Sequence, residues 1–211
     1  MSHFESICEI TGIMRKSDES YGSYANSTFI SPSHILTAWH NLSGIVKNEL
    51  AFTNCHGDHA RMKEGGLKIR STSSDLAIVE LDQPIGEDLY TRPINNNLLP
   101  DDGVGRLFAL HATGQRAVEM RVAPIHDLGG LKDSVPEGHI VFDCPNKQVR
   151  LGHSGAPVVN ESGFIVSVLS SAAFYKASHA PDAEFETSAR TFMGPSPEKV
   201  SDFVEDFLFR L

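Results

Sequence analysis

Ser154 is the residue of this chain whose setting best suits nucleophilic chemistry. It stands in the run Gly-His-Ser-Gly at residues 152–155, shortly before a strand-like apolar segment. Glycine allows backbone conformations that other residues rarely adopt, so a side chain can project from a sharp turn with N–H groups beside it. An acyl-transfer nucleophile needs this arrangement, because the developing oxyanion must meet donors that are already in place. A plain Gly-Ser-Gly turn between two strands is the alternative, and such turns are common.

His40 and Asp75 stand beside two other strand-like segments and precede the serine in the chain. His40 follows an apolar, strand-like segment at residues 34–37, and Asp75 opens another at residues 76–81. Histidine can gain or lose a proton near neutral pH. Each residue also has a structural explanation, the histidine as a strand end and the aspartate as the turn residue before a strand.

Short apolar runs alternate with turn residues along the sequence, which predicts an all-β chain. Strands and turns would therefore position these residues. Strands are expected at residues 8–14, 27–30, 34–37, 76–81, 106–111, 117–125 and 139–144, with a hairpin of 156–160 and 164–170 after the serine turn. Polar composition predicts loops at 15–26, 48–66 and 176–186, and a linker at 82–103. One helix is expected at the end, because Ser196 can cap it, Pro197 suits its first position, and apolar residues follow at three- and four-residue steps.

The composition is that of an acidic globular protein. Its 211 residues, 40% hydrophobic and 21% charged, suit one domain or two small barrels. A net charge of −9 without a basic run argues against nucleic acid or an anionic membrane as partner. The three cysteines, Cys8, Cys55 and Cys144, do not form a plausible disulfide framework. We see no signal peptide and no bilayer-length apolar run, so we expect a cytoplasmic protein.

A metal site is considered at residues 55–59, where Cys-His-Gly-Asp-His groups several ligand types. A zinc site usually needs a second pair of ligands further along the chain, and no obvious pair follows. Calcium in the 48–66 loop is conceivable but not favoured. We therefore expect a solvated loop here, and neither a metal nor an organic cofactor.

Three motifs, in the order His, Asp, Ser, resemble those of the trypsin-like (chymotrypsin-fold) serine proteases. Residues 37–40, Thr-Ala-Trp-His, are similar to the family's Thr-Ala-Ala-His. Residues 75–81, Asp-Leu-Ala-Ile-Val-Glu-Leu, are similar to its Asp-Ile-Ala-Leu-x-x-Leu. Residues 152–157, Gly-His-Ser-Gly-Ala-Pro, are similar to its Gly-Asp-Ser-Gly-Gly-Pro. The resemblance covers nearly the whole chain, including a C-terminal helix where the family has one.

The resemblance implies an all-β fold of two antiparallel β-barrels, with the active site in the cleft between them. Residues 1–95 would form the N-terminal barrel carrying His40 and Asp75, and residues 96–195 the C-terminal barrel carrying Ser154. Residues 196–211 would form a helix packed on the body.

The resemblance also implies a role for each catalytic residue. Ser154 would attack the scissile carbonyl, His40 would take its proton and deliver it to the leaving amine, and Asp75 would hold the imidazole. The backbone N–H groups of Gly152 and Ser154 would form the oxyanion hole.

The chain departs from the family next to these motifs. His153 replaces the aspartate that pairs, in zymogen-derived members, with a newly cut N-terminus, and the Ile-Val-Gly-Gly stretch exposed by that cut is missing. We therefore expect no activation by N-terminal cleavage: the enzyme is competent as made, or switched on by a protein partner or a conformational change. His153 leaves open whether the oxyanion hole is formed at rest. Asn41 stands where many secreted members have a cysteine, which favours an intracellular member.

By resemblance, substrate contacts are expected from Gln148, Ser170, Ser171 and Ala172. Gln148 would lie near the base of the pocket for the residue before the scissile bond, or be a simple turn residue. The other three would line its wall and pair with the substrate backbone as an added strand. Gln148 does not support a preference for Lys or Arg, and Leu169 does not support one for Glu or Gln. A small or medium, uncharged residue is the expected preference.

The leading hypothesis is an intracellular serine endopeptidase that acts on a protein or peptide substrate through an acyl-enzyme. The alternatives are a catalytically silent relative acting as a binding module, a viral-type polyprotein-processing protease, and a non-proteolytic esterase with the same triad. The complete triad argues against the silent relative. The lack of a Gly-x-Cys-Gly motif or a glutamine-pocket histidine argues against the viral type.

Overall fold

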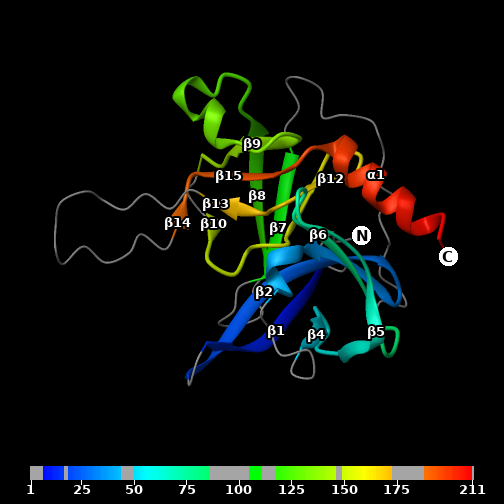
Figure 1. Cartoon of the computed structure of the whole chain (residues 1–211). Coiled ribbons are helices and arrows are strands. Elements are labelled where there is room, and N and C mark those ends of the chain that lie inside the picture. Colours follow the sequence, from blue (N-terminus) through cyan, green and yellow to red (C-terminus); the bar gives the residue numbers. More distant parts are fainter. Residues whose placement is uncertain are drawn as a thin grey trace.

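The first barrel is closed and consists of the first six strands of the chain (Figure 1). The structure, a computed structural model, describes residues 7–16, 19–43, 50–85, 105–110, 117–145, 149–172 and 188–210. The barrel strands follow the order β1-β2-β3-β6-β5-β4, and β4 pairs back with β1. They are β1 (Ile7–Lys16), β2 (Glu19–Ser31), β3 (His34–Ala38), β4 (Ala51–Asn54), β5 (His59–Ser71) and β6 (Leu76–Leu81).

The second half of the chain forms an open, seven-stranded antiparallel sheet, called here the second sheet, in the order β12-β11-β7-β8-β9-β15-β13. Its strands are β7 (Gly105–Leu110), β8 (Ala117–Pro124), β9 (His139–Asp143), β11 (Pro157–Val159), β12 (Ile165–Val168), β13 (Ser171–Ala172) and β15 (Thr191–Pro195). A separate short pair joins β10 (Val149–Arg150) to β14 (Ser188–Ala189). The described residues also form two 3-10 turns, η2 (Trp39–Asn41) and η4 (Gly129–Ser134).

Two hydrophobic cores fill the two halves, and a third joins them. Phe29 and Phe52 are fully buried in the first barrel, and Phe142 stacks on Phe192 in the second sheet, with ring centroids 5.0 Å apart. The third core contains side chains from both halves and from the C-terminal helix: Ile7, Leu36, Leu76, Ile78, Phe108, Val159, Ile165, Val168, Val200, Phe203, Val204 and Phe207. The two halves are therefore fixed against each other by buried apolar surface.

The expected C-terminal helix is confirmed as α1 (Pro197–Leu208). The Ser196 side chain accepts a hydrogen bond from the Lys199 N–H, and Pro197 occupies the first turn, as the sequence predicts. The inner face of the helix buries Val200, Phe203, Val204 and Phe207. Leu208 is 57% exposed, so the buried stripe ends earlier than predicted. Leu211 lies outside the described residues.

Two of the loops predicted from polar composition are strands instead. Residues 19–26 belong to β2, which pairs with β1 out to Lys16↔Glu19, and residues 51–66 contain β4 and much of β5. In β5, exposed residues alternate with partly buried ones, because only one face of a barrel strand contacts the core. In β2, Asn26, Ser27 and Thr28 are polar and yet fully buried.

The other sequence-based boundaries have mixed outcomes. The predicted strands of the second half and the 156–170 hairpin are confirmed to within a few residues. The barrel strands lie between Ile7 and Leu81, and the strands of the second sheet between Gly105 and Pro195. The 95/96 domain boundary, most of the 82–103 linker and the 176–186 loop lie outside the described residues, so the exact domain limits stay a prediction.

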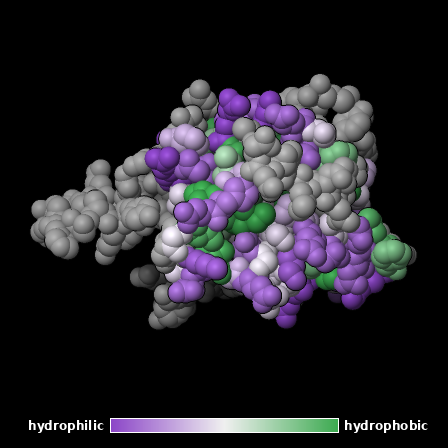
Figure 2. All heavy atoms as spheres, turned by 90° about the horizontal axis from the view of Figure 1, so that it is seen from above, coloured by the Kyte–Doolittle hydropathy of each residue, from purple (hydrophilic) through white to green (hydrophobic). Residues whose placement is uncertain are grey.

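The surface over the second sheet is largely hydrophilic. Seen from above, hydrophobic side chains lie in several separate areas among hydrophilic ones (Figure 2). Within the described ranges, no helix is both long and apolar enough to cross a membrane.

Candidate active site

His40 and Asp75 lie in contact on the first barrel. β3 pairs with β6 in the register Ala38↔Leu76, so the residues that follow β3 lie beside those that precede β6. The distance from His40 Nδ1 to Asp75 Oδ2 is 2.7 Å, and the His40 backbone N–H donates to Asp75 Oδ1 at 2.9 Å. The carboxylate thus fixes both the ring and the backbone of the histidine. The imidazole remains open to solvent, with 45% of the His40 side chain exposed against 18% for Asp75.

Asp75 has a left-handed backbone conformation, with a φ of +51°. Aspartate is among the few non-glycine residues that adopt this region with any frequency. The conformation belongs to the tight turn between β5 and β6, where the Asp75 carbonyl accepts the Trp39 N–H at 3.0 Å. The turn therefore holds the aspartate through its backbone as well as through its side chain.

Ser170, which the sequence places on a pocket wall, also bonds to the carboxylate of Asp75. Its Oγ donates to Asp75 Oδ2 at 2.5 Å, across a separation of 95 residues. The contact joins the second sheet to the first barrel, and no local pattern in the sequence signals it. Burial alone would raise the pKa of Asp75, but the hydrogen bonds from His40 and Ser170 outweigh burial and hold that pKa below its ordinary value.

Ser154 lies on a turn between β10 and β11 that is shaped by two glycines. The His153 N–H donates to the Arg150 carbonyl at 3.1 Å, and Gly152 between them has a φ of +91°. A positive φ at the third position is the mark of a type II turn, which requires glycine there. Gly155, directly after the serine, has a φ of +85°.

The backbone N–H groups of this turn can be accounted for one by one. The Gly155 N–H donates to the Leu169 carbonyl at 2.7 Å, and the Ala156 N–H donates to the His153 carbonyl at 3.0 Å. The N–H groups of Gly152 and Ser154 donate to no residue in the described part of the chain. These are the two donors that the sequence assigns to the oxyanion hole.

His153, the departure from the family motif, is fully buried inside this turn. Its Nδ1 accepts the Arg150 N–H at 3.2 Å. Two hydrogen bonds therefore join residues 150 and 153, one through the backbone and one through the imidazole. The histidine acts here as a hydrogen-bonding part of the turn.

The third contact of a triad, between Ser154 and His40, is not made in this structure. Among the described residues, neither Ser154 Oγ nor His40 Nε2 has a hydrogen-bond partner. Such contacts are often long in a site without substrate and tighten when substrate binds.

The expected substrate-binding residues are only partly described. Gln148 lies outside the described residues. Ser171 and Ala172 form β13, which pairs with β15 on one side. It is the edge strand at one end of the second sheet. Its other edge has no partner among the described strands, as an added substrate strand requires.

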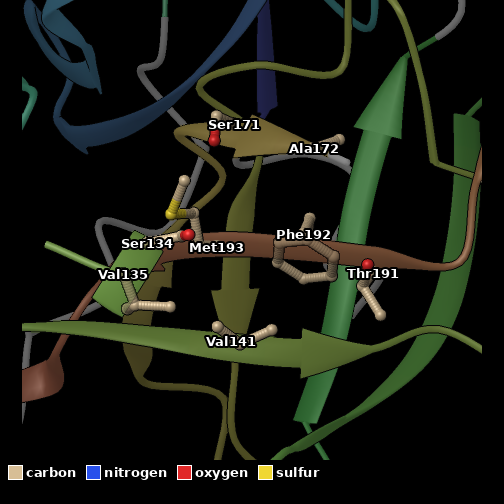
Figure 3. Close-up of a pocket in the computed structure, with 8 residues that line it drawn as sticks. All are labelled: Ser134, Val135, Val141, Ser171, Ala172, Thr191, Phe192 and Met193. Atoms are coloured by element: carbon tan, nitrogen blue, oxygen red, sulfur yellow. The ribbon is translucent and has the colours of Figure 1, made fainter. Parts of the chain in front are cut away.

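A cavity of about 180 Å³ opens beside β13 (Figure 3). Ser171 and Ala172 line it from β13, Phe192 and Met193 from β15, and Val141 from β9. Its other lining residues are Ser134, Val135 and Thr191. Most of these side chains are apolar, and an apolar cavity of about 150 Å³ is large enough for a benzene ring.

The predicted loop with Cys55, His56, Asp58 and His59 is a compact turn. Asn54 Oδ1 accepts the N–H groups of His56 and Asp58, and Asn54 Nδ2 donates to Asp58 Oδ2 at 2.8 Å. Across the described ranges, no three His, Cys, Asp or Glu side chains are grouped as metal ligands. None of the three cysteines, Cys8, Cys55 and Cys144, forms a disulfide.

The arrangement of barrel, sheet and C-terminal helix defines a protein with the trypsin-like (chymotrypsin) fold. The Rv3671c protease from M. tuberculosis, in its active form, is similar in structure, with a TM-score of 0.69 and 14% sequence identity over 97% of this chain and 82% of that one. An inactive form of Rv3671c from M. tuberculosis H37Rv, a serine-to-alanine mutant, gives a TM-score of 0.64 at 15% identity, over 98% and 88% of the two chains. No family model and no curated protein matches the chain. The comparison confirms the expected fold.

Proposed function

We propose that this protein is a serine endopeptidase in which Ser154, His40 and Asp75 are the catalytic residues. The observation that carries the proposal is the 2.7 Å contact between His40 and Asp75, reinforced by Ser170 from the opposite half of the molecule. Such a contact orients the imidazole and stabilises the imidazolium that forms when serine loses its proton. The likeness to a protease of the same fold supports the same chemistry.

The proposed reaction proceeds through an acyl-enzyme. Ser154 Oγ attacks the scissile carbonyl carbon while His40 Nε2 takes the hydroxyl proton. The oxyanion is stabilised by the N–H groups of Gly152 and Ser154, which have no acceptor among the described residues. His40 then gives its proton to the leaving amine, and a water molecule hydrolyses the ester by the same steps.

The proposed substrate is an extended peptide that pairs with the open edge of β13. One apolar side chain of the peptide would enter the cavity beside Ala172 and Phe192. A peptide library should therefore show a preference for an apolar residue at one position, with alanine or glycine there lowering kcat/KM by about tenfold or more. Ala172→Phe, which fills the cavity, should remove that preference. A preference unchanged in this variant would refute the assignment of the cavity.

A fluorophosphonate probe tests the proposal directly, because only an activated serine reacts with it. The folded chain should carry one label, on Ser154, located by mass spectrometry. Ser154→Ala should carry none, and Ser162→Ala, which changes an exposed hairpin serine, should be labelled as the wild type is. A folded chain that stays unlabelled would favour the catalytically silent binding module, and a label on another residue would refute the assignment of Ser154.

Two other activities share this chemistry and are separated by their substrates. An esterase would hydrolyse activated esters but no peptide of the library. A polyprotein-processing protease would cleave its own extended precursor. Neither is favoured by a specific contact in the site.

A further inference from the structure

Asn26 lies against the serine turn although it belongs to the other half of the molecule. It is a residue of β2 in the first barrel and is fully buried. Its backbone N–H donates to the Ser154 carbonyl at 2.8 Å, and its Nδ2 donates to the Gly152 carbonyl at 2.7 Å. Both bonds bridge the two halves of the fold at the residues proposed to bind the oxyanion.

These two bonds fix peptide planes that are also held at their other end. The peptide after Gly152 has its carbonyl on Asn26 and its N–H, that of His153, on the Arg150 carbonyl. The peptide after Ser154 has its carbonyl on Asn26 and its N–H, that of Gly155, on the Leu169 carbonyl. The Ser154 N–H belongs to the peptide between these two planes, and the Gly152 N–H belongs to the peptide just before the first of them. Neither donor can therefore turn away without loss of one of these hydrogen bonds.

Asn26 is itself held in place by its neighbours. Its carbonyl accepts Thr37 Oγ1 at 2.7 Å, and Thr37 Oγ1 accepts Asn41 Nδ2 at 3.0 Å. A Cβ added at Gly155 would lie 1.9 Å from the Asn26 carbonyl oxygen, so the two backbones approach more closely than any side chain would allow. A network on the first barrel thus supports the residue that holds the turn.

We propose that Asn26 is a positioning residue that keeps the N–H groups of Gly152 and Ser154 aimed at the oxyanion from across the interface between the two halves. This role rests on the proposed function. The residue acts through the turn and does not touch substrate. Loss of the Nδ2 donor should leave the fold in place but release the carbonyl end of the Gly152–His153 peptide. The two neighbouring peptides carry the N–H groups of Gly152 and Ser154, so both donors would be held less firmly, which weakens oxyanion stabilisation more than substrate binding.

The test compares Asn26→Ala with Asn54→Ala by the kinetics of fluorophosphonate labelling at Ser154. Asn54 is a matched control, since it is also buried in the first barrel and its Nδ2 also donates to a backbone carbonyl, that of Ile85, at 2.6 Å. Asn26→Ala should lower the maximal labelling rate by about 10- to 100-fold, part of the roughly 100- to 1000-fold cost of losing a donor outright. The probe concentration for half-maximal rate should change by no more than about twofold. Asn54→Ala should leave both values near those of the wild type.

Asn26→Asp is the second variant, because it keeps the size and shape of the side chain while an oxygen replaces the donor. It should also label more slowly than Asn54→Ala. Equal maximal rates for the Asn26 variants and Asn54→Ala would overturn the role of Asn26 while the proposed function stands. A folded wild-type chain that is not labelled would overturn the proposed function, and this role with it.

Discussion

The first barrel and the second sheet hold their parts of the candidate site in different ways. The first barrel fixes His40 through the side chain of Asp75, which bonds to both the ring and the backbone of the histidine. The second sheet presents Ser154 on a glycine turn whose peptide planes are held by backbone hydrogen bonds. One half thus orients the proposed proton carrier, and the other orients the proposed oxyanion donors.

This difference makes the interface between the halves important for the proposed chemistry. Ser170 reaches from the second sheet to Asp75, and Asn26 reaches from the first barrel to the serine turn. Each half therefore supplies a hydrogen bond that completes the other half's part of the site. The shared hydrophobic core, which includes Leu36, Phe108 and Phe203, holds the two halves in the relative position at which these contacts form.

The largest expected effect comes from the first-barrel contact. Asp75→Asn should lower kcat by about 10⁴-fold, because an amide at this position favours the wrong tautomer of the histidine. The measurement is the rate of ester or peptide hydrolysis by folded protein. Ser170→Ala, which removes only the bond from the second sheet, should have a much smaller effect. Equal losses in both variants would contradict the separate roles given to the two halves.

The next effect concerns the glycine turn of the second sheet. Gly155→Ala should lower the free energy of unfolding by about 3 kcal/mol or more, because the new Cβ combines a strained φ with a clash against Asn26. Gly65→Ala in β5 is the matched control, since it has a φ of +69° but open space around it, and about 1–2 kcal/mol is expected. Urea unfolding measures both. Similar losses of unfolding free energy in the two variants would mean that the clash with Asn26 does not contribute to the effect at Gly155.

The smallest effect is the pH dependence that Asp75 gives to stability. Its pKa is lower in the folded protein than in the unfolded chain, where about 3.9 is usual for aspartate, so its stabilising contribution is present above that value and lost as the pH falls through the folded pKa. The difference in unfolding free energy between wild type and Asp75→Asn should therefore be constant from about pH 5 to 8 and shrink below about pH 4. Ser170→Ala removes one of the hydrogen bonds that lower this pKa, so the contribution of Asp75 should be smaller and should be fully lost at a higher pH. A difference that grows on acidification would contradict this sign.

Strand β2 shows where reasoning from the sequence fell short. The polar residues 15–26 predict a loop, but β2 begins at Glu19, and Asn26 is fully buried in it. Ser27 Oγ donates to the Cys8 carbonyl at 3.0 Å, and Asn26 donates to the serine turn. Buried polar groups are tolerated when hydrogen bonds satisfy them, and here those partners come from another strand and from the serine turn. Polarity alone was therefore a poor guide at this interface.

The sequence by itself determined the all-β class, the order of the three motifs and the capped C-terminal helix. These features depend on neighbouring residues, such as the Ser196 cap on Lys199, or on periodicities within one segment. Only the tertiary structure decided that Ser170 bonds to Asp75 and that Asn26 holds the Gly152 carbonyl, across 95 and 126 residues. No local pattern encodes such contacts, because they form only when buried apolar surface brings the first barrel and the second sheet together.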